Sequence, residues 1–151
     1  MKISMTERKL YIECLQYNRV LPSGNMYTKQ FAEKVVKQFN EDKQFRDSIS
    51  LIPSVSDRLE ISYPDVALKL TNLWIDDEDQ SLYANVIILD TPKGHQLEQE
   101  LNEGSTLQVS PKALSEPVKV DGIDIITKES ELFFFEYKTT PYAYSSWRRE
   151  Y

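Results

Sequence analysis

The chain has 151 residues, which suits one domain of ordinary size and leaves little room for a second. Hydrophobic residues make up 40% and charged residues 28%, a balance that excludes wholesale disorder. The net charge of −6 argues against nucleic acid as the main partner, because phosphate binding needs concentrated positive charge.

One cysteine and one histidine exclude an internal disulfide and a structural zinc site. No apolar run approaches the roughly 20 residues of a membrane span, and the first residues lack the apolar core of a signal peptide. We therefore expect a soluble, acidic protein made in a reducing compartment, with no cofactor or metal and with neither nucleic acid nor a membrane as partner.

The first half of the chain contains signals for a strand and a helix. Alternating apolar and polar residues predict a strand over Lys9–Gln16, and a loop follows. Thr28 is a candidate N-cap, and the apolar residues after it recur at helical spacing up to about Asn40. The next stretch is polar and contains two prolines, and we expect short extended pieces at residues 48–52 and 58–62.

A hairpin is predicted in the middle of the chain. Residues 66–74 alternate between apolar and polar, and residues 82–89 return as a strand that is apolar on both faces near its end, which is typical of a central strand. The turn between them, residues 76–81, carries four acidic side chains. It lacks the spacing of a calcium loop, so a solvated turn is favoured over a calcium site.

The clearest local signals belong to a second helix. Thr91 is a candidate N-cap, Pro92 stands at the first helical position, and Gly104 is a natural stop. Residues 106–110 then read as a strand.

The last third of the chain is rich in predicted strands. Asp121-Gly122 is a two-residue hairpin signal, and residues 131–138 form a further strand. The apolar run at residues 132–135 favours a strand buried on both faces, with an exposed edge used for pairing between chains as the alternative. These elements define a single strand-rich α+β domain, barrel-like or a packed antiparallel sheet, with about two helices. We divide it into a domain at residues 1–138 and an aromatic arm at residues 139–151.

The residues by themselves offer little catalytic chemistry. His95 is the only imidazole, and at the start of the second helix it is interpreted as a surface residue. Cys14 lies on the inward face of the first strand and is interpreted as a core residue. No pair of carboxylates stands out as a general acid and base.

Three stretches carry a resemblance to a known family. Residues 18–40 are similar to an opening loop "N-x-R-x-Y" and the helix after it. Residues 66–94 are similar to a hairpin and a turn "I-L-D-T-P-x-G", and residues 101–110 to a strand "G-x-x-x-G-x-S-S-R-G". In this order and spacing they resemble the prohead (capsid maturation) proteases of tailed phages. That family consists of serine proteases whose strand-rich fold is related to the herpesvirus assembly proteases.

The resemblance implies which positions would carry the chemistry. It places the nucleophile at Ser110 and the general-base histidine at Ile52. After Ser110, the segment Pro111-Lys112-Ala113 replaces the family's "S-R-G", and Pro111 lacks a backbone N–H that an oxyanion hole could use. On these departures we expect Ser110 to be vestigial and the chain to be a pseudo-protease rather than an enzyme.

The resemblance also implies a setting. We expect an auxiliary or minor structural protein of a tailed-phage capsid, made in the host cytoplasm, located in the phage head, and bound to the major capsid protein or other virion proteins. Homo-oligomerisation within such an assembly is left open. One alternative is an active maturation protease that uses Ser110 and takes its base from His95 or from a partner subunit. A second is a module that binds scaffold peptides without cutting them. A third is an unrelated binding module whose likeness to the family is accidental.

The aromatic arm is the candidate binding segment, because tyrosine, tryptophan and arginine anchor protein interfaces. An arm that folds back over its own sheet is the equally weighted alternative. The candidate binding residues are Tyr142, Tyr144, Trp147, Arg148 and Tyr151.

Overall fold

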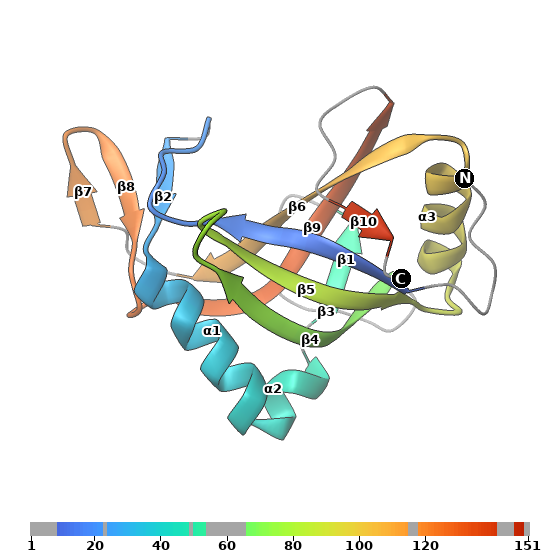
Figure 1. Ribbon diagram of the computed structural model, residues 1–151, viewed down its shortest axis with the longest axis horizontal. Helices are drawn as coiled ribbons and strands as arrows, with labels where there is room; N and C mark the ends of the chain where they lie inside the picture. Colours follow the sequence, from blue (N-terminus) through green and yellow to red (C-terminus); the bar gives the residue numbers. More distant parts are fainter. Residues whose placement is uncertain are drawn as a thin grey trace.

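The computed structural model describes residues 9–22, 24–48, 50–53, 66–114, 118–141 and 147–149. Ten strands and three helices follow one another along these residues (Figure 1). Their order is β1 (Lys9–Gln16), β2 (Asn25–Tyr27), α1 (Lys29–Glu41), α2 (Lys43–Ser48), β3 (Ser50–Pro53), β4 (Leu68–Asp76), β5 (Ser81–Ile88), α3 (Pro92–Asn102), β6 (Ser105–Leu114), β7 (Val118–Val120), β8 (Ile123–Ile126), β9 (Glu131–Pro141) and β10 (Trp147–Arg149).

Seven strands form one sheet in the order β10-β1-β5-β4-β3-β9-β6, and β2, β8 and β7 form a second, smaller sheet. The large sheet curls, so that β6 at one end comes back to contact β1 near the other. Helix α1 packs against β4, and α3 contacts β5 and β6 (Figure 1). This arrangement confirms the predicted strand-rich α+β fold. Two strand pairs depart from the antiparallel expectation, because β3 pairs parallel with β9 and β2 pairs parallel with β8.

The first strand and the first helix form where the sequence predicts them. β1 has the predicted bounds, and its inward side chains, Leu10 and Cys14 among them, are fully buried. A register shift between Glu13 and Leu15 turns Leu15 inward as well, although strict alternation would expose it. Thr28 caps α1, because its side chain accepts a hydrogen bond from the backbone N–H of Phe31 at 3.2 Å.

The segment after α1 differs from the prediction. Residues 43–48 form the short helix α2, which was not predicted, and the extended piece expected at residues 48–52 is the strand β3 at residues 50–53. Asp42 begins this helix by accepting from the backbone N–H of Phe45 at 3.1 Å. That capping contact was missed in the sequence because the helix is too short for a periodic pattern. The extended piece predicted at residues 58–62 lies outside the described residues.

The predicted hairpin is formed by β4 and β5, and β5 is central, between β1 and β4. Its acidic turn is tied to the rest of the fold. The Tyr17 hydroxyl donates to the Asp77 carboxylate at 2.5 Å, and Lys29 forms an ion pair with the same carboxylate at 2.9 Å. Within the described residues no group of three or more potential metal-ligating side chains gathers, in this turn or elsewhere.

Helix α3 begins and ends as predicted. The Thr91 side-chain oxygen accepts from the Gly94 backbone N–H at 3.0 Å and donates to the Val66 carbonyl at 2.6 Å. This one hydroxyl therefore caps the helix and also fastens it to the segment that enters β4. Gly104 ends the helix with a φ of 94°, a conformation that glycine adopts without strain.

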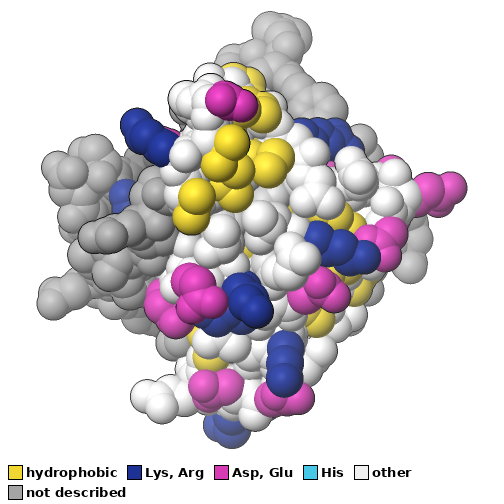
Figure 2. Space-filling view, turned by 90° about the vertical axis from the view of Figure 1, so that its left-hand side faces the viewer, with side chains coloured by type: hydrophobic (Ala, Val, Ile, Leu, Met, Phe, Trp, Pro, Cys, Tyr) yellow, Lys and Arg dark blue, Asp and Glu magenta, His cyan; other side chains and the backbone are white. Residues whose placement is uncertain are grey.

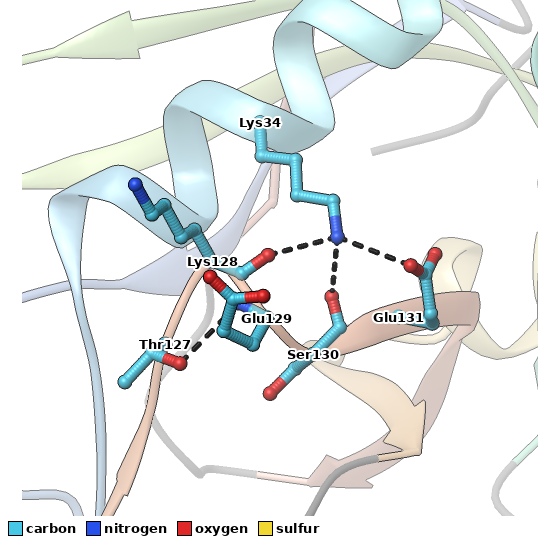
Figure 3. A network of polar contacts seen from close by, with 6 residues as sticks. All are labelled: Lys34, Thr127, Lys128, Glu129, Ser130 and Glu131. Carbon is cyan, nitrogen blue, oxygen red and sulfur yellow. Dashed lines mark hydrogen bonds and ion pairs between the residues drawn. The ribbon is translucent and has the colours of Figure 1, made fainter.

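A network around Lys34 joins α1 to the turn between β8 and β9 (Figure 3). Its ammonium group donates to the carbonyl oxygens of Lys128 and Ser130 at 2.8 and 2.9 Å and lies 3.2 Å from the Glu131 carboxylate. The turn is thereby held to the helix by one cation, although the two are almost a hundred residues apart in sequence.

The small sheet contains the predicted Asp121-Gly122 hairpin, and both turn residues have positive φ angles of 51° and 79°. Figure 2 views the molecule from this side and shows apolar side chains gathered in its upper part. Val118 and Val120 of β7 are 53% and 46% exposed.

The last two strands, β9 and β10, show where the apolar run at residues 132–135 and part of the C-terminal arm lie. β9 lies between β3 and β6, and Leu132 and Phe135 are buried, as expected for an internal strand. β10 pairs with β1, Ile12 being opposite Trp147, so residues 147–149 fold back onto the chain's own sheet. The predicted division at residue 138 stays a prediction, although β9 continues past it to Pro141.

Candidate active site

Ser110, the position that the resemblance marks as nucleophile, lies in β6 at the edge of the large sheet and is exposed. The strand is longer than predicted and continues through Pro111, which is paired in register with Phe135. Proline is tolerated here because an edge strand can turn the proline nitrogen away from its neighbour. The rigid sheet, and not a loop, therefore sets the position of Ser110.

The sheet register brings Ser110 and Ile52 to either side of one residue. Ser110 of β6 is paired with Glu136 of β9, and Ile52 of β3 is paired with the same Glu136 from the other side. Directly opposed residues on neighbouring strands lie on one face of a sheet. The two positions that the resemblance assigns to nucleophile and base thus form one row, with a carboxylate between them.

Glu136 was missed in the sequence. Its side chain is half-buried. The pKa of Tyr27 is raised to about 12, first by the burial of Tyr27 and second by the negative charge of the Glu136 carboxylate. The signal that could have found it is an ionisable residue directly after the apolar run at residues 132–135, between Phe135 and Tyr137.

A cavity of about 550 Å³ opens beside Ser110. Its walls come from β1, from residues 108–111 of β6, from Tyr137 and Lys138 of β9, and from the chain around β2. Burial raises the pKa of Tyr137, and the Glu100 carboxylate raises it further. The pKa of Tyr27, which also lines the cavity, is raised as well. Both phenols therefore stay neutral at physiological pH, and the charged groups of the lining are Glu13 and Lys138.

The other candidate residues lie apart from this row. His95 is exposed at the start of α3, where it pairs with the Asp90 carboxylate, and it is not among the residues that line the cavity. Cys14 is fully buried, and burial raises the pKa of its thiol, so it is a core residue as predicted. Among the described helices, none is long and apolar enough to cross a lipid bilayer.

The predicted binding residues of the arm are only partly covered by the structure. Tyr142, Tyr144 and Tyr151 lie outside the described residues. Trp147 and Arg148 belong to β10, opposite Ile12 and Tyr11 of β1. A role for these five residues in binding a partner stays a prediction.

The comparisons with known proteins support the fold. No known protein family matches the sequence, and no curated protein matches it. Among solved structures, the chain is similar to the bacteriophage T4 capsid assembly protease gp21, with a TM-score of 0.71 and 18% sequence identity. The alignment covers 83% of this chain and 77% of that one. The chain therefore has a fold like that of a phage capsid assembly protease.

This likeness contradicts one prediction. The departures at Ile52 and Pro111 led us to expect a protein that is not an enzyme. The solved structure to which this fold is similar is that of a protease, and this contradicts the expectation of a non-enzyme. The expectation rested on the residues at Ile52 and Pro111, and the sequence could not show that the sheet register sets Glu136 opposite Ser110.

Proposed function

We propose that this protein is a serine-type peptidase of phage capsid assembly, with Ser110 as its nucleophile and capsid or scaffold proteins as its substrates. The observation that carries the proposal is the exposed Ser110 on a rigid edge strand, at the wall of a cavity of about 550 Å³, in the fold of a capsid assembly protease. Cavities of this volume are typical of ligand sites.

The proposed step needs a proton acceptor, and we assign this role to Glu136. Side chains of directly opposed strand residues have Cβ atoms about 4.5–5.5 Å apart, so the Glu136 carboxylate is within reach of the Ser110 hydroxyl. The Ser110 oxygen would bond to the carbonyl carbon of the substrate while its proton passes to Glu136. The C–N bond would then break, the proton would move to the leaving amine, and water would hydrolyse the acyl ester to free Ser110.

The negative charge on the carbonyl oxygen also needs a partner. Pro111 offers no backbone N–H, so we assign stabilisation of the oxyanion to the Lys138 ammonium, whose residue lines the same cavity as Ser110. Lys138 is paired with Gln108, two residues from Ser110 on the same strand, which places Lys138 on the same face.

The test is coexpression of the chain with the capsid and scaffold proteins of the same genome, followed by mass spectrometry of the termini of those proteins. We expect new termini with the natural chain and none with Ser110→Ala. Ser105→Ala is the matched control, since Ser105 lies on the same strand and does not line the cavity. Partner chains that stay whole with the natural protein, or that are cut equally by Ser110→Ala, would contradict the proposal.

The proposed role in capsid assembly is tested on purified phage particles. A maturation peptidase acts inside the immature head, so we expect the chain in immature heads. Mass spectrometry of purified immature and mature particles measures this. Absence of the chain from both would remove the capsid role.

A further inference from the structure

The outer face of the large sheet carries aromatic rings across β1, β5 and β4, which are neighbours in the sheet (Figure 1). Tyr83 of β5 is paired with Trp74 of β4, and their rings are stacked, with centroids 5.9 Å apart and 20° between the ring planes. The Tyr11 ring of β1 meets the Tyr83 ring edge-on, with centroids 6.2 Å apart. All three side chains are half-buried, whereas the residues on either side of Tyr11 and Tyr83 are fully buried. Because successive side chains of a strand point to opposite faces, these three rings, which we call the aromatic row, point away from the core.

Carboxylates surround the end of the aromatic row that lies nearest to the hairpin turn. The Tyr83 hydroxyl donates to the Asp79 carboxylate at 2.7 Å, and Glu13 of β1 is paired with Tyr83 from the other side. Burial raises the pKa of Tyr83, the hydrogen bond to Asp79 raises it further, and so do the negative charges of Glu13, Asp79 and Asp76. Three carboxylates therefore act on one phenol, which stays neutral at physiological pH.

The Glu13 carboxylate is held in place by neutral groups. The Ser81 hydroxyl donates to it at 2.8 Å and the Gln16 side-chain amide at 3.1 Å. None of the ion pairs formed among the described residues includes Glu13. Its negative charge is therefore oriented by the fold and can pair with a cation from another molecule.

This acidic end of the row carries a surplus of negative charge. Glu13 and the turn at residues 76–79 contribute five carboxylates. Among the described residues, two cations contact this group, because Lys29 pairs with one carboxylate of the turn at 2.9 Å and Arg19 donates to a carbonyl of the turn at 2.5 Å. Five negative charges against two positive ones leave a net charge of −3. Arg148 belongs to the opposite end of the row.

Aromatic rings and carboxylates together match the chemistry of lysine and arginine. Cationic head groups are attracted to the negative face of an aromatic ring, and their aliphatic stems pack on apolar surfaces. Carboxylates supply the opposite charge. We propose that the aromatic row and its acidic end form a docking surface for a lysine- and arginine-rich segment of another protein.

This docking surface goes beyond the proposed function and does not rest on it. Tyr11, Trp74 and Tyr83 do not line the cavity beside Ser110. Glu13 belongs to both, so the docking surface adjoins the cavity.

Binding is measured by fluorescence anisotropy with the Ser110→Ala variant, so that cleavage plays no part. The probes are labelled octapeptides in which serine alternates with lysine, arginine, glutamine or glutamate. We expect the lysine and arginine peptides to bind about tenfold or more tightly than the glutamine and glutamate peptides, and their affinity to fall as salt is added. Equal affinity for the arginine and glutamine peptides, or no binding of either basic peptide at about 1 mM, would overturn the inference.

A pair of double variants tests the location. Glu13→Gln with Asp79→Asn removes two carboxylates beside Tyr83 and should weaken binding of the arginine peptide about tenfold. Glu103→Gln with Glu129→Gln removes two exposed carboxylates outside this face, leaves the same net charge, and should change the affinity by less than about twofold. An equal loss in both double variants would mean that only the overall charge attracts the peptide, and the docking surface would be wrong.

The contribution of the rings is tested at Trp74. Trp74→Leu keeps an apolar side chain without a ring and should weaken binding of the arginine peptide about fivefold, whereas Trp74→Phe keeps a ring and should retain most of the affinity. Circular dichroism spectra check that each variant is folded. Unchanged binding by Trp74→Leu would contradict the inference, because the carboxylates alone would then account for the affinity.

Discussion

Ser110 on β6 is paired with Glu136 on β9, and the partner of Glu136 on its other side is Ile52 of β3. The row spans two strand spacings, about 10 Å between the outer backbones. A side chain at either end can therefore act with the carboxylate in the middle.

This row predicts a gain of function. If Ser110 is the nucleophile, Ile52→His adds an imidazole at the position where the resemblance places the base. Peptide cleavage should rise about tenfold or more, because the pKa of an imidazole lies nearer the operating pH than that of the Glu136 carboxylate, and an imidazole is therefore the stronger general base. The measurement is the cleavage rate of a peptide that the natural chain cuts. Ile52→Asn supplies a polar side chain without a base and should give no increase. A similar increase with Ile52→Asn would show that polarity, and not proton transfer, is responsible.

Gly94 is required by close approach and not by backbone conformation. A Cβ atom at this position would lie well inside van der Waals contact with the carbonyl oxygen of Leu89. Although alanine has the higher helix propensity, Gly94→Ala should lower the free energy of unfolding by about 3 kcal/mol. Urea unfolding followed by circular dichroism measures this. Gln96→Ala, exposed on the same helix, should leave the stability nearly unchanged. Equal stability of Gly94→Ala and Gln96→Ala would mean that the turn between Leu89 and Gly94 widens for the added methyl group without a loss of stability.

Lys34 should contribute to stability through the turn that it holds. Lys34→Met removes the donor for two carbonyl oxygens and one carboxylate, and we expect a loss of about 1–2 kcal/mol (Figure 3). Chemical unfolding is the measurement. Lys37→Met removes an exposed lysine from the same helix and should change stability by less than about 0.5 kcal/mol. An equal loss of stability in Lys34→Met and Lys37→Met would mean that the loss comes from removing a positive charge from the helix and not from the contacts of Lys34.

The acidic turn predicts a pH dependence. Hydrogen bonds from Tyr17 and Lys29 hold the pKa of Asp77 below its ordinary value. An aspartate with a lowered pKa stabilises the fold above its unfolded pKa, near 3.9, and this stabilisation is lost as pH falls through the lower folded pKa. Between pH 7 and 3 the natural chain should therefore lose more stability than Asp77→Asn, measured by urea unfolding at each pH.

Glu78→Gln is the control for this prediction, because it removes one negative charge from the same turn and its residue contributes a backbone N–H there. It should keep the acid sensitivity of the natural chain. Equal acid sensitivity in the natural chain and Asp77→Asn would mean that the contacts of Asp77 do not stabilise the folded state.

Local signals in the sequence determined most of the elements. The alternation over Lys9–Gln16, the Thr28 and Thr91 caps, and the turn at Asp121-Gly122 each predicted an element that the structure confirms. These signals depend on neighbours within a few residues of one another, so they can be read without knowing the rest of the fold.

The tertiary structure alone decided which distant residues meet. The parallel pairing of β3 with β9 joins residues more than eighty positions apart, and it is this pairing that puts Glu136 between Ile52 and Ser110. The curl of the sheet likewise brings β6 to β1 and opens the cavity between them. Register and closure depend on the packing of all the strands together, and no local pattern of side chains specifies them.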